Sequence, residues 1–258
     1  GLHISKEEYA RQFISDVICH EVGHCLGLRH NFEGSTELST AQLADDSLTS
    51  RIGTTASVMD YTPVNIQAVL KGHGNFFMPT VGEYDTWAIQ YGYEPCPGAV
   101  TPLAEKPQLQ NVASKSGQPG HAYMSDENVN RWDPYAVMFD CGKDPINFSE
   151  KMLEAAARER KYAIEMLPKP GESYEARTRL VLQSVSETFR EGRMSARFIG
   201  GIRASRSFSG DTGASATLMP VDPAVQRQAL HQILQHCLEP GSLGLSKQVL
   251  VNLSGDPS

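Results

Sequence analysis

The sequence predicts a mainly α-helical chain with one β-hairpin, and three observations support this fold class. Ser5 and Glu8 match a capping box, a pair typical of helix starts, and apolar residues follow at three- and four-residue steps. Three further amphipathic stretches lie in the C-terminal half. Between two of them, strand-like segments flank the turn sequence Ser-Gly-Asp-Thr-Gly at 209–213. We therefore expect helices through most of the chain and a hairpin near 197–221.

The first helix is expected from Lys6 to Leu28, with Tyr9, Phe13 and Val17 on an apolar face that packs the domain. Next we expect a loop over 31–56 with a helical hint at 40–50, followed by a turn over 57–61. An irregular loop over 65–79 could form a wall of a cleft. A helix is expected over 80–91, and it ends at Gly92. Residues 94–118 are rich in Pro, Gly, Ser and Lys, which predicts a linker laid over the surface.

The C-terminal half is predicted to form a small helical bundle. Ser149 can cap one helix, which Pro168 stops, and a second helix is expected over 173–191. Asp222 and Pro223 start a third helix with a cap followed by the proline that suits a first turn. We expect these three helices to pack their apolar faces together.

Composition excludes several classes of partner. The chain has 258 residues, of which 40% are hydrophobic and 21% charged, enough for one sizeable domain or two small ones. A net charge of -7 without a basic run argues against nucleic acid or an anionic membrane as the main partner. No apolar run approaches the roughly 20 residues of a membrane span. We therefore expect no nucleic-acid partner and no transmembrane segment.

The first helix carries the residues that point to chemistry. His20 and His24 are one turn apart on the same helix face, so their imidazoles can converge on one metal ion with Glu21 beside them. Gly27 stands where the helix should stop, because glycine accepts the left-handed backbone that lets the chain double back. His30 can then return as a third ligand. The pattern indicates a hydrolytic zinc site.

The chemistry of zinc explains why these residue types occur together. Three neutral imidazoles leave a fourth position open for water, and the metal lowers the pKa of that water to about 7. Glu21 is rotated by ~100° around the helix from His20, so its carboxylate can face the water without occupying the metal. We expect Glu21 to act as the general base.

Residues 20–30 read His-Glu-x-x-His-x-x-Gly-x-x-His, and Ser-Val-Met-Asp-Tyr follows at 57–61. This combination resembles the extended zinc signature of the metzincin metallopeptidases with its downstream methionine turn, or Met-turn. The resemblance implies a zincin-like fold. It implies zinc ligands at His20, His24 and His30, a base at Glu21, a turn at Gly27, a hydrophobic floor beneath the metal at Met59, and a side chain reaching the zinc or the oxyanion at Tyr61.

The resemblance extends to a subgroup. Asn31, which follows the third histidine, matches none of the best-known metzincin branches. Together with 57–61 and the stretch Gly82–Tyr93, it looks most like the bacterial EcxA-like zinc-binding group, which carries a long C-terminal extension. The domain organisation implied is a zinc-binding subdomain over 1–95, an irregular linker over 96–145 and a helical extension over 146–258.

Metzincins build the upper rim of their cleft from an N-terminal twisted sheet whose edge strand pairs with the substrate, and 19 residues precede His20. We therefore expect that sheet to be missing from this chain and to lie upstream in a longer precursor, whose N-terminal region is a partner of this chain. On this interpretation the chain binds zinc but is a poor or inactive protease alone.

A second metal and the redox compartment are less directly indicated. The acidic residues that could hold calcium are Asp126, Glu127, Asp133, Asp140 and Asp144, but their intervals match no known calcium loop, and turns and helix caps explain them more simply. The five cysteines are Cys19, Cys25, Cys96, Cys141 and Cys237, and a disulfide among the last three stays open. An exported protease is the usual family setting, whereas unpaired cysteines favour a reducing compartment.

The leading function is a zinc-dependent endopeptidase that acts on a protein or peptide substrate. An alternative from another class is a zinc-stabilised binding module whose helical extension grips a partner or the rest of its own chain. A third interpretation, the protease part of an AB-type toxin, rests on the EcxA-like resemblance alone. The response of fold and activity to metal removal separates the first two.

Overall fold

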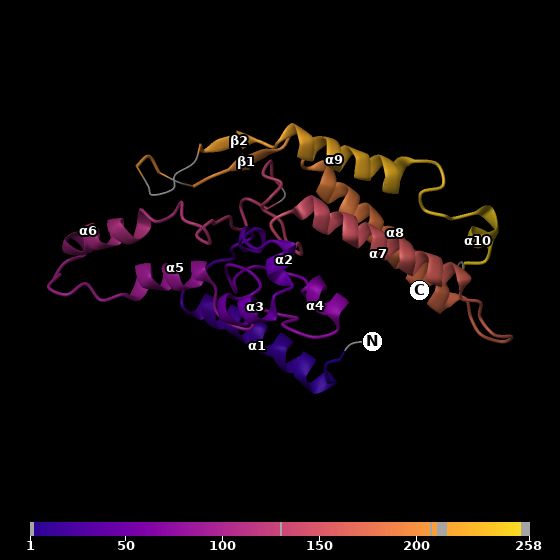
Figure 1. The fold of residues 1–258 in the computed structure, drawn as a ribbon, viewed down its shortest axis with the longest axis horizontal. Coiled ribbons are helices and arrows are strands. Elements are labelled where there is room, and N and C mark those ends of the chain that lie inside the picture. The colour runs from indigo at the N-terminus through magenta and orange to yellow at the C-terminus, as the bar shows by residue number, and fades with distance from the viewer. Residues whose placement is uncertain (1–2, 130, 207, 211–215, 254–258) are drawn as a thin grey trace. The chain divides into compact units, whose positions relative to one another are not determined.

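The computed structural model describes residues 3–129, 131–206, 208–210 and 216–253 (Figure 1). About 52% of the chain is helical, and one two-stranded antiparallel sheet is present, which confirms the predicted mainly α class. The chain forms two compact units. The first unit comprises Gly1–Pro145 and Ile202–Met219, and the second comprises Ile146–Gly201 and Pro220–Ser258.

The helices of the first unit are α1 (Lys6–Cys25), the 3-10 helix η1 (Gly34–Thr36), α2 (Thr40–Leu43), α3 (Asp46–Ile52), α4 (Ile66–Lys71), α5 (Glu83–Tyr93) and α6 (Pro102–Ala113). The strands are β1 (Ile202–Ala204) and β2 (Leu218–Pro220), which form the hairpin expected near 197–221. The amide of Ser205 donates to the carbonyl of Thr217 beside these strands. Residues 211–213 of the expected turn lie outside the described residues.

The two ends of α1 follow from local chemistry. Ser5 Oγ accepts a hydrogen bond from the Glu8 amide at 3.0 Å, which satisfies one free donor of the first turn. The Glu8 carboxylate binds the Arg11 guanidinium at 2.6 and 2.7 Å, so the cap bond returned by Glu8 in a capping box does not form. The helix ends at Cys25, short of the predicted Leu28, because Gly27 adopts a φ of +87° and reverses the chain.

The predicted burial of the apolar face of α1 is largely wrong. Only His20 and Gly23 of this helix are buried. Tyr9 and Phe13 contact Phe77 with ring centroids 5.1 and 5.2 Å apart, but half of the Phe13 side chain is exposed. A row of apolar residues on α1 is 41–55% exposed and consists of Phe13, Ile14, Val17, Ile18 and Val22. The first unit thus covers one side of α1 and leaves an apolar side open.

The helical hint at 40–50 is confirmed by α2 and α3, but other loop predictions missed helices. Asn65 caps α4 within the expected loop over 65–79. The stretch predicted as a linker contains α6, which Thr101 caps and Pro102 opens. Gly92 does not cap α5, because that helix continues to Tyr93 and ends in extended backbone at Glu94.

The second unit is a helical bundle. Its elements are α7 (Pro145–Glu165), α8 (Glu175–Ala196), α9 (Pro223–Ile233), the π-helix η2 (Leu234–Leu238) and α10 (Lys247–Val251). Helix α9 packs along α8, as Figure 1 shows, and it begins with the predicted Asp222 cap. Buried arginines link the helices: Arg160 donates to Thr188 Oγ1 at 2.9 Å, and Arg177 donates to the Ile164 carbonyl near the end of α7 at 2.8 Å.

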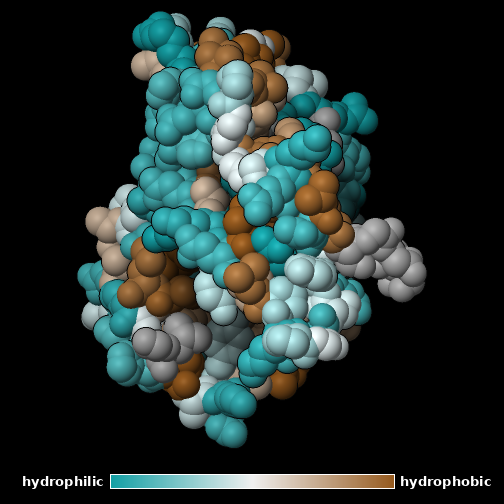
Figure 2. Space-filling model, turned by 90° about the vertical axis from the view of Figure 1, so that its right-hand side faces the viewer, coloured by the Kyte–Doolittle hydropathy of each residue, from teal (hydrophilic) through white to brown (hydrophobic). Residues whose placement is uncertain are grey.

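The surface carries apolar residues in several places. On the face drawn in Figure 2, hydrophobic residues gather in separate patches between hydrophilic ones. Within the described residues, no helix combines the length and the apolar character needed to cross a membrane.

Candidate metal centre

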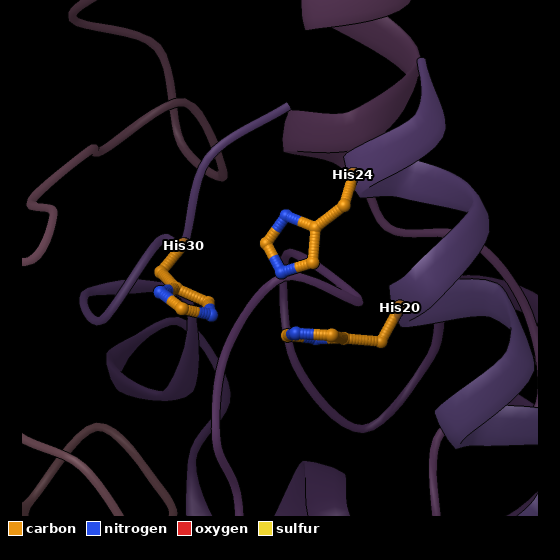
Figure 3. A group of neighbouring side chains, drawn as sticks. All are labelled: His20, His24 and His30. Carbon is orange, nitrogen blue, oxygen red and sulfur yellow. The ribbon is translucent and has the colours of Figure 1, made fainter. Parts of the chain in front are cut away.

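Two elements bring three histidines together. The last turns of α1 present His20 and His24, and the reversal at Gly27 returns His30 to the same space. The Leu28 amide donates to the Gly23 carbonyl at 3.0 Å, which holds the reversed chain against the helix. One ligand atom from each histidine lies within 4.8 Å of the others, and Figure 3 shows the three rings facing a common space. Within the described residues, they are the one group of three or more His, Cys, Asp or Glu side chains placed to hold a metal ion.

The outer nitrogen of each ring has an acceptor that orients it. His20 Nδ1 lies 2.8 Å from the Val58 carbonyl, His24 Nδ1 lies 3.0 Å from the Leu28 carbonyl, and His30 Nδ1 lies 2.8 Å from Asp126 Oδ1. Because carbonyl and ionised carboxylate oxygens only accept, each Nδ1 carries a proton and donates it, and in the neutral tautomer this leaves the Nε2 lone pair for a metal.

The inner nitrogens fit a metal. Nε2 of His20 and Nε2 of His30 are buried without a hydrogen-bond partner, a costly arrangement unless a ligand satisfies them. Burial lowers the pKa of His20, which favours the neutral imidazole that a metal requires. Three neutral nitrogen donors with oriented rings are the donor set of catalytic zinc.

A buried carboxylate positions the segment opposite α1. Asp85 in α5 accepts from Ser57 Oγ at 2.6 Å, from the Val58 amide at 2.8 Å and from the Gly82 amide at 2.8 Å. Burial raises the pKa of Asp85, although these three hydrogen bonds act to lower it. The Val58 carbonyl is the acceptor for His20 Nδ1, so Asp85 positions the His20 ring indirectly, by holding the backbone of Val58. Sequence reasoning missed Asp85, because 27 residues separate it from Val58.

Met59 lies fully buried against α1. A Cβ atom on Gly23 would stand 2.3 Å from Met59 Sδ, so the helix and the methionine meet at a point where only glycine fits. This contact lies between the two helical histidines in sequence. Met59 thus packs under the segment of α1 that carries them.

Asn31, the residue that differs from the best-known metzincin branches, holds a neighbouring segment in place through hydrogen bonds. Its side chain is fully buried and donates to the Ala122 carbonyl at 2.9 Å, while its Oδ1 accepts from the Met124 amide at 3.3 Å. These bonds fasten residues 122–124 beside the third histidine. Asp126 follows two residues later, within reach of His30.

The two side chains expected to act on substrate differ in their surroundings. The Tyr61 ring lies beside the histidines, with centroids 4.6 Å from His30 and 5.2 Å from His20. Glu21 is exposed on α1, next to His20 in sequence. The Tyr61 ring is thus half-buried next to two of the histidines, whereas the Glu21 side chain is open to solvent.

The calcium prediction receives no support from the described geometry. Asp126 binds His30 and Arg29, Glu127 binds Arg29 at 2.6 Å, and Asp133 accepts from the Tyr135 and Ala204 amides. Asp140 accepts from Ser35 Oγ at 2.9 Å. These side chains bind histidine, arginine, amide and hydroxyl partners, and among the described residues they form no group placed to hold a cation.

Replacing Asp126 with Asn should weaken zinc binding about 10- to 100-fold, because the neutral amide is a poorer acceptor for His30 Nδ1. Competition with a chromophoric chelator measures this affinity. Glu127→Gln is the matched control, since it removes a neighbouring charge that binds Arg29 and no histidine. Equal zinc affinity in Asp126→Asn and the wild type would contradict the role of this carboxylate.

Comparison with known proteins adds the family. A protein-family model described as Met-zincin matches residues 3–255, which is nearly the whole chain. Neither the curated proteins nor the solved structures gave a match. The match covers both the histidine site and the helical unit that follows it, and such proteins imply zinc as the metal of this site. The chain belongs to the Met-zincin family.

Proposed function

We propose that this chain carries the catalytic centre of a zinc-dependent metalloendopeptidase. The observation that carries the proposal is the set of three oriented imidazoles, whose Nε2 atoms converge while their Nδ1 protons are held by Val58, Leu28 and Asp126. A structural zinc site is normally closed by four protein ligands, whereas three leave room for water and substrate.

The chain's own residues supply the remaining steps. When bound, zinc provides a Lewis acid for the scissile carbonyl and an acidified water. Glu21 takes a proton from the attacking water and delivers it to the leaving amine. The Tyr61 hydroxyl donates a hydrogen bond to the carbonyl oxygen as negative charge develops on it. Met59 supports the metal site from below as the residue of the Met-turn.

The exposed apolar side of α1 is an argument that another polypeptide segment covers this unit. Ile14, Ile18 and Val22 recur at four-residue steps on that side and are about half exposed. Five neighbouring apolar residues on one helix are more than the scattered exposure usual in a globular surface. We propose that an upstream region of a longer precursor covers this side and supplies the sheet that pairs with substrate. Residues 1–258 alone are then a weak or inactive protease.

The finer assignments are also part of the proposal. We place the chain in the EcxA-like group on the strength of Asn31, the segment 57–61 and the stretch Gly82–Tyr93. We also propose an exported setting, because that is the usual setting of the family. We retain the division into a zinc-binding subdomain over 1–95, a linker over 96–145 and a helical extension over 146–258.

The alternative, a zinc-stabilised binding module, makes an opposite prediction on metal removal. We expect 1,10-phenanthroline to abolish hydrolysis of an unstructured protein substrate and to leave the helical circular dichroism almost unchanged, because α1 and the turn at 57–61 are held by hydrogen bonds that do not involve the metal. Added zinc should restore the rate.

This experiment uses residues 1–258 and, in parallel, the protein with its natural upstream sequence. Loss of helicity on chelation, with no hydrolysis in either protein, would contradict the peptidase and favour the binding module. A rate for residues 1–258 equal to that of the longer protein would contradict the need for an upstream partner.

A further inference from the structure

Phe139 lies in a segment whose backbone is anchored along the metal centre. The Val137 amide donates to the Phe32 carbonyl at 3.3 Å, and the Phe139 amide donates to the Tyr61 carbonyl at 2.7 Å. Further along, the Gly142 amide donates to the Ser35 carbonyl at 3.0 Å. The backbone of segment 137–142 is therefore hydrogen-bonded to Phe32 and Ser35, which lie shortly after His30 in sequence, and to Tyr61, which lies shortly after Met59.

Phe139 adopts a conformation that costs energy. Its φ is +65°, and within the described residues it is the one non-glycine residue with a positive φ. This left-handed region is unfavourable for a bulky side chain because Cβ approaches the backbone, and Gly or Asn would fit better. Such strain persists where the surroundings over-determine the backbone, and it clusters at functional sites.

The conformation exposes the ring beside Tyr61. Val137 and Asp140 on either side are almost fully buried, whereas Phe139 is 50% exposed. The rings of Phe139 and Tyr61 stack with centroids 6.0 Å apart and an angle of 21° between their planes. Tyr61 in turn lies 4.6 Å from His30. The apolar face of Phe139 is thus exposed to solvent close to the histidines, with only the Tyr61 ring between Phe139 and His30.

We propose that Phe139, stacked on Tyr61, forms the wall of a subsite that binds a large apolar side chain of the peptide substrate. The inference rests on the proposed peptidase function and assigns it a substrate preference. A half-exposed aromatic ring gains from contact with an apolar side chain, because both surfaces leave water. The strained backbone keeps the ring in place before substrate arrives, so little ordering is needed on binding.

The test uses two hydroxamates as probes, N-acyl-phenylalanine hydroxamate and N-acyl-alanine hydroxamate, titrated by calorimetry into zinc-loaded residues 1–258. We expect the wild type to bind the phenylalanine compound about tenfold more tightly, the ratio that burial of most of an aromatic side chain can give. In Phe139→Ala and Phe139→Gly, the affinities for the two hydroxamates should differ by no more than about twofold. Phe139→Tyr, which keeps the ring, should retain it.

Three controls separate the causes. Zinc affinity, measured by chelator competition, should be unchanged in every Phe139 variant. Tyr61→Phe keeps both rings and should keep the preference, and Phe189→Ala, which removes a similarly exposed ring from α8, should leave the ratio unchanged.

Without metal, Phe139→Gly should melt roughly 3 °C above Phe139→Ala, because glycine relieves the positive φ that alanine retains.

The outcomes distinguish this inference from the function on which it rests. A tenfold preference that survives Phe139→Ala and Phe139→Gly would overturn the subsite and leave the peptidase proposal standing. Failure of the zinc-loaded wild type to bind either hydroxamate would contradict both. Equal melting temperatures for the glycine and alanine variants would overturn the claim that the ring is held by strain.

Discussion

Replacing Glu21 with Gln is expected to lower kcat/KM for peptide hydrolysis by about 10²- to 10⁴-fold, the usual contribution of a general base. The amide keeps the size of the side chain but cannot accept the proton of the attacking water. Zinc affinity should stay within about threefold of the wild type, because the metal is held by His20, His24 and His30. Initial rates on a quenched fluorescent peptide and chelator competition measure the two quantities.

Glu7→Gln is the matched control for this substitution. It removes the same charge from an exposed position in the first turn of α1, far along the helix from the histidines, so the rate should not change. Turnover by Glu21→Gln close to that of the wild type, in whichever form of the protein hydrolyses the peptide, would refute Glu21 as the base. A large loss of zinc affinity would show that Glu21 is needed to form the site.

The second large effect is expected for Gly82→Ala. A Cβ atom on Gly82 would lie 1.9 Å from the Ala56 carbonyl oxygen and 2.7 Å from the Ser57 amide nitrogen. Both are backbone atoms, so no change of rotamer relieves the overlap and the chain must shift. We expect a loss of at least about 3 kcal/mol in the free energy of unfolding, the upper range for overpacking. Urea titration followed by circular dichroism measures it.

The same substitution should weaken zinc binding. The Gly82 amide and the Ser57 and Val58 groups share the Asp85 carboxylate, so a shift at Gly82 moves the Val58 carbonyl that orients His20. Gly92→Ala, in the helix that Gly82 caps, is the control: a Cβ there meets no atom within 4 Å, and alanine should stabilise the helix by about 1 kcal/mol. Stability of Gly82→Ala equal to that of Gly92→Ala would contradict the predicted clash.

What the sequence could predict was local. The start of α1 depends on Ser5 accepting from an amide three residues away, and the placement of the histidines depends on helical spacing and one glycine. Helix α9 was predictable for the same reason, since Asp222 and Pro223 act within one turn. These signals need no knowledge of the tertiary structure.

What the sequence could not predict depends on contacts between distant residues. Asp126 is 96 residues from His30, and no spacing rule connects a loop carboxylate to a particular imidazole. The period of α1 indicated an apolar face but not what covers it, so the burial of Phe13 and Val17 was wrongly expected. Phe139 carries no local signal, because its left-handed backbone is imposed by anchors on Phe32, Tyr61 and Ser35.

The orientation of the three imidazoles has a consequence for protein engineering. Each Nδ1 is held by a different part of the chain: Val58 lies 38 residues after His20, Leu28 belongs to the reversal, and Asp126 comes from a distant loop. A graft of residues 20–30 onto another scaffold would therefore carry the ligands and one of their three acceptors. The His20 and His30 rings would then lack the acceptors that orient them. The smallest portable unit of this metal site comprises at least four separate segments, which contain α1 with its reversal, Val58, Asp85 and Asp126.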